Sequence, residues 1–292
     1  MISQALSFSR ARVRDYLELA KPRLVSLVLL SAAVGFFLAS RGPVDVPLLL
    51  ATFFGTAFVA AGSMTLNQWM EREEDARMIR TAARPLPAGR LQPAEALVFG
   101  IVLSLCGLAV LFWTVNPVSA LLAALTLASY LFLYTPLKRK TTLCTIVGAV
   151  PGALPPLIGC AAVQGRPSFE AWILFAVIFL WQMPHFLAIA WLYRDDYAAA
   201  GFRMLSVDDP AGRQVGRQII LYSLALLPAS LLPSAAGLTG PVYFLTALVL
   251  GIGFIALAFR SAGRMAQNAR PLFRASVIYL ALLLVLMVLD KI

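Results

Sequence analysis

The sequence predicts an all-α protein, a polytopic membrane helix bundle with about nine transmembrane helices and a cytoplasmic N-terminus. Of its 292 residues, 60% are hydrophobic and only 13% are charged, which is too apolar for a soluble domain of this size. Nine apolar runs of about 18 to 23 residues are each long enough to cross a bilayer. The basic residues gather in alternate connections between these runs. Together these observations define the fold class and the orientation.

The elements follow in a simple order along the chain. Residues 8–20 mix arginines with apolar side chains, which is typical of an amphipathic helix lying in the membrane interface. The predicted spans are 23–40, 46–66, 95–114, 117–135, 143–163, 170–192, 217–235, 241–259 and 272–290. We therefore expect a cytoplasmic or interfacial N-terminal segment, residues 1–22, and a single intramembrane domain, residues 23–292.

The distribution of positive charge predicts the orientation. An odd number of spans places the termini on opposite sides, and all but three of the 24 lysines and arginines then fall on the side of the N-terminus. The exceptions are Arg41, Arg166 and Lys291. The positive-inside rule makes the basic side cytoplasmic, so the formal charge of +10 reflects topology rather than a nucleic-acid partner. Since no acid-poor transit peptide is evident, we expect a bacterial plasma membrane.

Acidic residues are absent from the middle of every predicted span, where an ion-coupled transporter usually needs one. They gather instead on the predicted cytoplasmic side, in 71–75 after the second span and at Asp195 and Asp196 after the sixth. No turn signal ends either span, so we expect both helices to continue into the cytoplasm and the two acidic clusters to face one another.

The first acidic cluster predicts a metal and diphosphate site. On a continuous helix, Asn67, Glu71 and Asp75 are spaced i, i+4, i+8 and form a column at the membrane surface. Such oxygen ligands suit Mg²⁺, which completes its shell with water and substrate phosphates. Nearby cations can clamp those phosphates, namely Arg80, Arg84, Lys138 and Arg139. The alternative is a solvated helix whose charges pair along its own surface.

Several motifs together resemble the UbiA-type intramembrane prenyltransferase superfamily, which has nine spans and two acid-rich cytoplasmic motifs. They cover about residues 20–210 in the right order: AKPR at 20–23, Asn67 with Glu71 and Asp75, RTAARPLPAGR at 80–90, YTPLKRKT at 134–141, GALPPLIG at 152–159, WQMPHFLAIAW at 181–191 and YRDDYAAAGFRML at 193–205. WQMPHF and DYAAAG separate the haem-modifying branch from the quinone-forming members. Glu71 departs from the family pattern, which usually has Asp there.

The resemblance implies transfer of a farnesyl group from farnesyl diphosphate to a vinyl group of haem B, with addition of water. It implies one Mg²⁺ on Asn67, Glu71 and Asp75 and a second on Asp196 with Asp195. Membrane lipid surrounds the site, and haem A synthase and a terminal oxidase are the candidate assembly partners. Three alternatives remain: a prenyltransferase for a quinone precursor or other aromatic acceptor, a membrane transporter, and haem transfer or insertion without chemistry.

Aromatic and polar residues within the spans indicate the substrate pocket. Tyr134, Trp181 and Tyr197 are candidates to stabilise an allylic carbocation, or else to anchor the helices at the interface. His185, the only histidine, follows Pro184, where we expect a kinked helix lining a cavity. It can ligate haem iron or form a hydrogen bond to Gln182 or to a facing helix. The prolines and glycines of 148–159 predict close helix packing or a distorted cavity wall.

Overall fold

A computed structural model describes residues 2–292, with side chains from residue 11 onward. Within these residues nine helical segments are long and apolar enough to cross a membrane, as the sequence predicts. They are α2 (Pro22–Ala39), α3 (Val46–Met70), α5 with η1 (Pro93–Val110, Leu111–Val115), α6 with η2 and α7 (Pro117–Ala128, Ser129–Tyr134, Thr135–Leu137), α8 with α9 (Cys144–Ala153, Pro155–Gln164), α10 (Phe169–Leu192), α13 (Arg213–Ala235), α14 (Pro241–Ala262) and α15 (Met265–Leu289). The chain is a multi-pass membrane protein.

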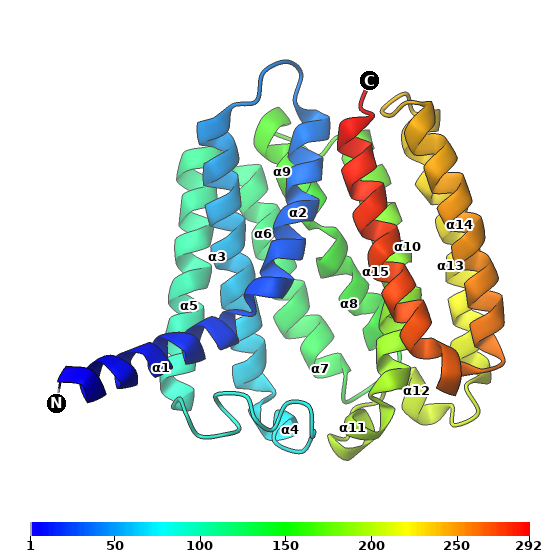
Figure 1. Ribbon diagram of the computed structural model, residues 1–292. Coiled ribbons are helices and arrows are strands. Elements are labelled where there is room, and N and C mark those ends of the chain that lie inside the picture. Colours follow the sequence, from blue (N-terminus) through cyan, green and yellow to red (C-terminus); the bar gives the residue numbers. More distant parts are fainter. Residues whose placement is uncertain (1) are drawn as a thin grey trace.

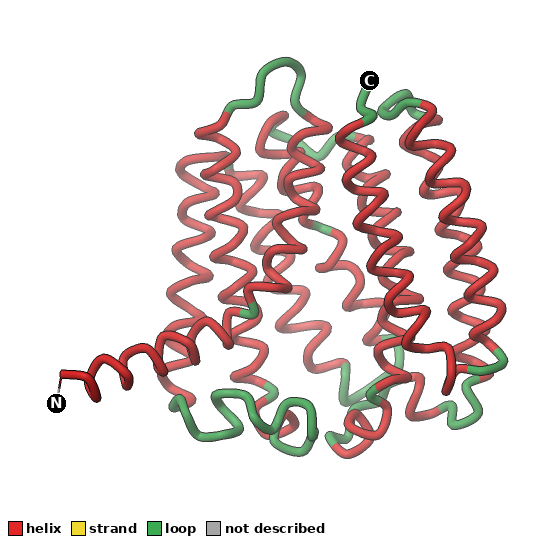
Figure 2. Tube along the Cα trace, in the orientation of Figure 1, coloured by secondary structure: helices red, strands yellow, loops and turns green. Residues whose placement is uncertain are grey.

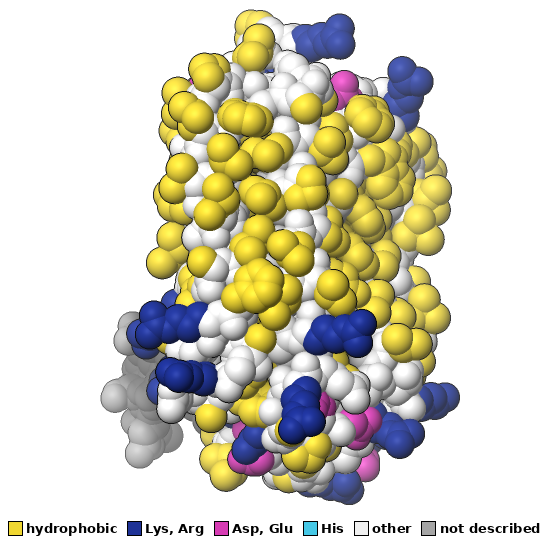
Figure 3. Space-filling model, turned by 90° about the vertical axis from the view of Figure 1, so that its right-hand side faces the viewer, with side chains coloured by type: hydrophobic (Ala, Val, Ile, Leu, Met, Phe, Trp, Pro, Cys, Tyr) yellow, Lys and Arg dark blue, Asp and Glu magenta, His cyan; other side chains and the backbone are white. Residues whose placement is uncertain are grey.

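The spans form one bundle, and the shorter elements gather at one of its ends (Figures 1 and 2). At the lower end lie α4 (Arg72–Asp75), α11 (Arg194–Ala199) and α12 (Leu205–Asp208), and α1 (Ile2–Ala20) extends sideways from there. Figure 3 shows an apolar wall on the visible side and a concentration of charged side chains at that lower end. Large apolar side chains such as Phe54 (57% exposed) face outward because lipid is their solvent.

The fifth span is a broken helix that packs closely on the first. α8 ends at Ala153 and α9 begins at Pro155, because two consecutive prolines lack the N–H groups that would continue the ladder. A Cβ on Gly159 would lie 1.9 Å from the carbonyl oxygen of Ala32 on α2, and one on Gly35 would lie 2.1 Å from that of Pro156. Glycine is therefore required at both positions, and the predicted close helix packing is confirmed.

Both helices that carry acidic clusters are interrupted at the end of the membrane span, which differs from the expected continuous helices. α3 ends at Met70, and Glu71 leaves the helical region with φ −100° and ψ 14° before α4 begins. The backbone bonds Glu71 N–Asn67 O (2.9 Å) and Asp75 N–Glu71 O (2.7 Å) persist across this break. The three residues of the column therefore stay one turn apart, although the helix axis does not run straight through them.

A second irregularity, in the fourth span, directly precedes the loop that faces the acids. The fourth span passes through the π-helical turn η2 directly before Thr135 and Pro136. Pro136 has no N–H and its ring crowds the preceding turn, which a wider π turn accommodates. The fourth span ends at Leu137, and Arg203 N donates to the Lys138 carbonyl oxygen (2.7 Å). This loop is thereby tied to the segment after the second acidic cluster.

The N-terminal helix α1 is also fixed to the charged end. Arg90, in the loop after α4, donates to Asp15 (2.6 Å) and to Glu18 (2.9 Å) on α1. Gln68 of α3 donates through Nε2 to the carbonyl oxygen of Leu19 (2.8 Å). These contacts hold the junction of α1 and α2 against the charged end of α3.

Candidate active site at the charged end of the bundle

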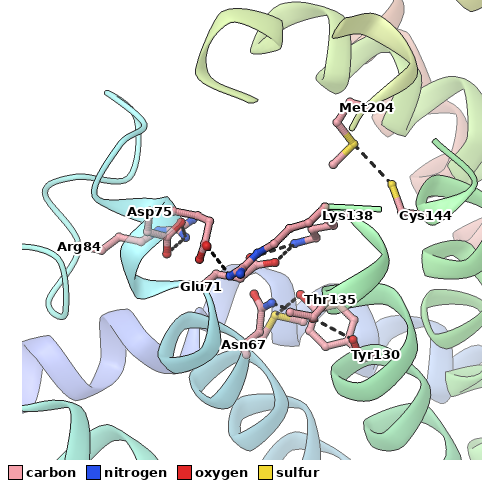
Figure 4. Close-up of polar contacts among 12 residues, drawn as sticks. Asn67, Glu71, Asp75, Arg84, Tyr130, Thr135, Lys138, Cys144 and Met204 are labelled. Atoms are coloured by element: carbon pink, nitrogen blue, oxygen red, sulfur yellow. Dashed lines mark hydrogen bonds and ion pairs between the residues drawn. The ribbon is translucent and has the colours of Figure 1, made fainter. Parts of the chain in front are cut away.

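Three carboxylates of the first cluster each face a cation from elsewhere in the chain (Figure 4). The Nζ atom of Lys138 donates to both oxygens of Glu71, at 2.7 and 2.9 Å. Nη1 of Arg84 donates to both oxygens of Asp75, at 2.8 and 2.7 Å. Glu74 pairs with Arg139. The site therefore balances its own charge before any ligand binds.

The acids of the predicted column are buried within the protein. Glu71 is 4% exposed and Asp75 1% exposed, because the loops that carry Lys138 and Arg84 cover them. A buried carboxylate without a partner is costly, so the pairing follows from the burial. Lys138 is itself 8% exposed. Burial would lower the pKa of its amine, but the Glu71 carboxylate outweighs this and raises the pKa.

Asn67 is held at the foot of the cluster by a hydrogen bond across the bundle. Its Nδ2 donates to Oγ1 of Thr135 (3.1 Å), and Thr135 donates in turn to the carbonyl oxygen of Tyr130 (2.9 Å), inside the π turn (Figure 4). The contact occupies a donor of the Asn67 amide and leaves its carbonyl oxygen to another partner. Thr135 is therefore a part of the site that the sequence analysis missed, although it lies within the YTPLKRKT motif.

The second acidic cluster reaches the first through the backbone. Asp196 accepts from the N–H of Ile79 (3.1 Å) and of Arg80 (3.4 Å), so the second cluster contacts the loop that follows the first cluster. Asp195 does not join them, because its side chain is 98% exposed and its ion-pair partner is Arg194 at 3.6 Å. Among residues 11–292 no three His, Cys, Asp or Glu side chains are grouped to hold a metal, since the buried acids engage cations or N–H groups instead.

Two of the predicted aromatic residues lie at this site. Nζ of Lys138 lies 4.6 Å from the ring centre of Tyr134 and 5.6 Å from that of Phe202. Tyr197 packs into the same cluster, 6.1 Å from Phe202 between ring centres. Arg80 extends its exposed guanidinium over the ring of Tyr193 at 4.7 Å. The site therefore has an aromatic wall beside its cations.

Lys21, which belongs to the AKPR motif at residues 20–23, is a further residue of the site. It adopts left-handed backbone angles, φ 49° and ψ 61°, as the only non-glycine residue with positive φ among those described. That conformation costs on the order of 1 kcal/mol or more, so the surrounding contacts must impose it. Burial, and then the neighbouring charge of Arg84, lower the pKa of the Lys21 amine to about 7. A lysine directly before the first span was the available signal.

A separate polar group lies deeper in the bundle around His185. Its Nδ1 lies 2.8 Å from Oγ of Ser276 on α15, and Ser276 donates its only hydroxyl hydrogen to the carbonyl oxygen of Phe273 (2.7 Å). With that assignment Nδ1 carries the proton, which leaves a lone pair on Nε2. Phe273 also lies 5.0 Å from the imidazole between ring centres.

Trp181 and Gln182 flank His185 in ways that differ from the sequence expectation. Trp181 stacks on the imidazole at 4.7 Å and donates through Nε1 to the Ser276 carbonyl oxygen (2.6 Å), so it belongs to this group rather than to the aromatic wall of Tyr134. Gln182 does not bond His185. It donates to the carbonyl oxygens of Ala149 (3.1 Å) and Ile178 (3.2 Å) instead.

Comparison with known proteins places this arrangement in a family. The family model for the UbiA prenyltransferase family matches residues 28–287, and the chain therefore belongs to that family. Curated relatives named protoheme IX farnesyltransferase include those of Solibacter usitatus, 49% identical over 96% of this chain and 99% of the relative, and Aquifex aeolicus, 38% identical over the full length of both. The relative from Opitutus terrae is 45% identical over 97% of this chain and 96% of its own.

Solved structures share the fold at low sequence identity. A digeranylgeranylglyceryl phosphate synthase aligns with a TM-score of 0.80 at 19% identity, covering 96% of this chain and 98% of the other. A UbiA homologue from Aeropyrum pernix aligns with a TM-score of 0.69 at 20% identity, covering 90% and 98%. The all-α fold class is thereby confirmed.

Proposed function

We propose that this chain transfers a farnesyl group from farnesyl diphosphate to a vinyl group of haem B and adds water, which gives haem O. The observation that carries the proposal is the buried set of paired charges formed by Glu71 with Lys138 and Asp75 with Arg84. The name of the relatives, protoheme IX farnesyltransferase, supports this donor and acceptor. In this proposal residues 23–292 form the prenyltransferase domain and residues 1–22 an interfacial segment.

The donor atoms of the site fit a divalent cation of the Mg²⁺ type. Every acid supplies hard oxygen ligands, and Oε2 of Glu74 is buried without a hydrogen-bond partner, so the site holds unused acceptor capacity. Asn67, Glu71 and Asp75 would hold one cation. Asp196 would hold a second, with Asp195 only if its side chain turns inward. A bound cation would neutralise charge on the departing diphosphate. A distant homologue from Archaeoglobus fulgidus, described as bound to GPP and Mg²⁺, supports this assignment.

The basic residues would bind the diphosphate while the acids turn to the cation. Lys138 and Arg84 can separate from Glu71 and Asp75 without leaving a buried charge unpaired only if the cation and the diphosphate both bind. Either ligand alone would leave a buried charged group without a partner. Arg80, Arg139 and the Lys21 amine add positive charge around the same point. The site therefore binds cation and diphosphate cooperatively.

Ionisation of the allylic C–O bond then depends on keeping water away from the new carbocation. The apolar bundle excludes water, and the rings of Tyr134 and Tyr197 present electron-rich faces close to the cations that hold the diphosphate. The haem vinyl group, rather than water, is then the first nucleophile to meet the farnesyl cation. Water adds afterwards to complete the hydroxyethylfarnesyl group.

His185 is our candidate to hold the haem. Its Nδ1 is engaged by Ser276, which fixes the ring and leaves Nε2 available to ligate iron. Trp181 and Phe273 supply flat apolar surface against the imidazole, at 4.7 and 5.0 Å between ring centres. Gln182 would line the wall towards α8.

We further propose that the charged end faces the cytoplasm, because all but three of the 24 basic residues lie on that side of the spans. Bacterial relatives support a location in the bacterial inner membrane. Haem A synthase and a terminal oxidase are the proposed assembly partners.

A product assay tests the function directly. Purified protein in detergent is supplied with haem B, farnesyl diphosphate and Mg²⁺, and products are identified by mass spectrometry. We expect a metal-dependent haem product that is heavier by one farnesyl group and one water. Prenylation of a quinone precursor alone would show that the acceptor is wrong. No reaction with either acceptor would return the transporter to consideration.

A further inference from the structure

Glu74 is a buried acid that flanks the predicted column of Asn67, Glu71 and Asp75. It follows Glu71 by three residues on the turn α4 and is 6% exposed. One carboxylate oxygen, Oε1, pairs with Arg139, whereas Oε2 is one of three buried side-chain polar atoms without a hydrogen-bond partner in the described part of the chain. The other two belong to hydroxyl groups, so this is the single charged group left partly unsatisfied.

Glu74 is one of two nearby acids that form ion pairs with two consecutive basic residues. Glu71 and Glu74, spaced i and i+3, receive Lys138 and Arg139 respectively. These two neighbouring ion pairs hold the loop after α7 against the start of α4. They differ in exposure, because the Lys138 side chain is 10% exposed and that of Arg139 is 52% exposed. The Arg139 guanidinium therefore contacts a buried carboxylate while much of the side chain remains exposed to solvent.

We propose that Glu74 is a positioning residue for the diphosphate site, which acts by holding the Arg139 guanidinium in a fixed orientation beside Lys138. The inference rests on the proposed function and deepens it. A guanidinium carries five N–H donors in a planar fork, so Arg139 can keep one contact to Glu74 and offer the others to a phosphate. Leaving Glu74 altogether would strand a buried carboxylate, so Arg139 stays bound to it while it accepts the ligand.

Glu74→Gln in the full-length protein tests this role, with Glu73→Gln as the matched control. Glu73 lies on the same turn, but its side chain is 72% exposed and its ion-pair partner is Arg72 at 3.4 Å. The probe is inorganic diphosphate with Mg²⁺, whose dissociation constant is measured by calorimetry beside KM for farnesyl diphosphate, kcat and Tm. We expect Glu74→Gln to weaken diphosphate binding about tenfold and to raise KM similarly, because an ordered Arg139 becomes mobile. Saturated kcat and Tm stay near wild type, and Glu73→Gln changes none of these quantities.

A double-mutant cycle with Arg139→Gln separates positioning from the alternatives. If Glu74 acts through Arg139, both single variants lose diphosphate affinity and the double variant loses no more than Arg139→Gln alone. Additive losses would overturn the proposal, as would unchanged diphosphate affinity in Glu74→Gln. Weaker binding of Mn²⁺ in the absence of diphosphate would make Glu74 a metal ligand instead. Should Glu74→Gln fail to fold, Arg139→Lys keeps the pair but removes the fork, and undiminished diphosphate binding in it would refute the idea. If the wild type does not bind diphosphate, the proposed function itself fails.

Discussion

Removing Lys138, the positive partner of Glu71, should destabilise the protein, whereas replacing both members of this ion pair by neutral residues should not. In Lys138→Met, the carboxylate of Glu71, 4% exposed, loses the amine that contacts both of its oxygens. Breaking a buried ion pair from one side costs about 3–5 kcal/mol. With an unfolding entropy of about 2.1 cal/mol/K per residue, the 292 residues give roughly 0.6 kcal/mol/K. The Tm should therefore fall by about 5–8 °C.

The double variant Glu71→Gln, Lys138→Met should recover most of that loss, since a neutral replacement of a buried pair is often neutral in stability. Turnover should not recover, because the diphosphate has lost a cation and the metal a ligand, and we expect a loss of about a hundredfold or more. Thermal unfolding in detergent and the mass-spectrometric assay measure the two quantities. Glu73→Gln, which removes the exposed partner of Arg72, is the control and should leave Tm almost unchanged. A stable Lys138→Met protein, or an active double variant, would refute the reasoning.

Four further predictions follow from the same geometry. Saturating diphosphate should tighten Mn²⁺ binding at least about tenfold in calorimetric titrations, and independent affinities would contradict the exchange of partners. His185→Ala should change the haem absorption spectrum and weaken haem retention, with Ser276→Ala showing a smaller effect; an unchanged spectrum in His185→Ala counts against iron ligation. Because the pKa of Lys21 is about 7, its positive charge is present below pH 7 and lost above it. Diphosphate affinity of the wild type should therefore fall about tenfold from pH 6 to pH 8 relative to Lys21→Arg, which stays protonated. Parallel pH profiles of the two proteins would exclude the effect. Gly152→Ala should lower Tm, because its Cβ would lie 2.0 Å from Oε1 of Gln182, at an expected cost of about 1–3 kcal/mol, and an unchanged Tm would show that Gln182 moves freely.

The hydropathy of the chain was enough to predict the bundle. Each predicted span overlaps an observed one, as with residues 170–192 and α10, Phe169–Leu192. Apolar length is a local property that the bilayer thickness imposes on every span, so it can be read without knowing what packs beside it. The location of both acidic clusters at the same end of the bundle could also be predicted, since both follow spans that end on the same side. The ninth span begins earlier than predicted, at Met265 rather than at residue 272, because its helix extends beyond the apolar run.

The tertiary structure decided which charges meet and how deeply they are buried. Glu71 pairs with Lys138, 67 residues away, and His185 meets Ser276, 91 residues away. Sequence spacing shows which residues share a helix face, but it does not show which distant loop covers that face. Lys21 and Glu74 entered the site for the same reason, since their importance arises from their position beside other segments. The sequence by itself therefore determined the membrane bundle and the acidic ends of two helices, whereas long-range packing determined the paired charges that define the site.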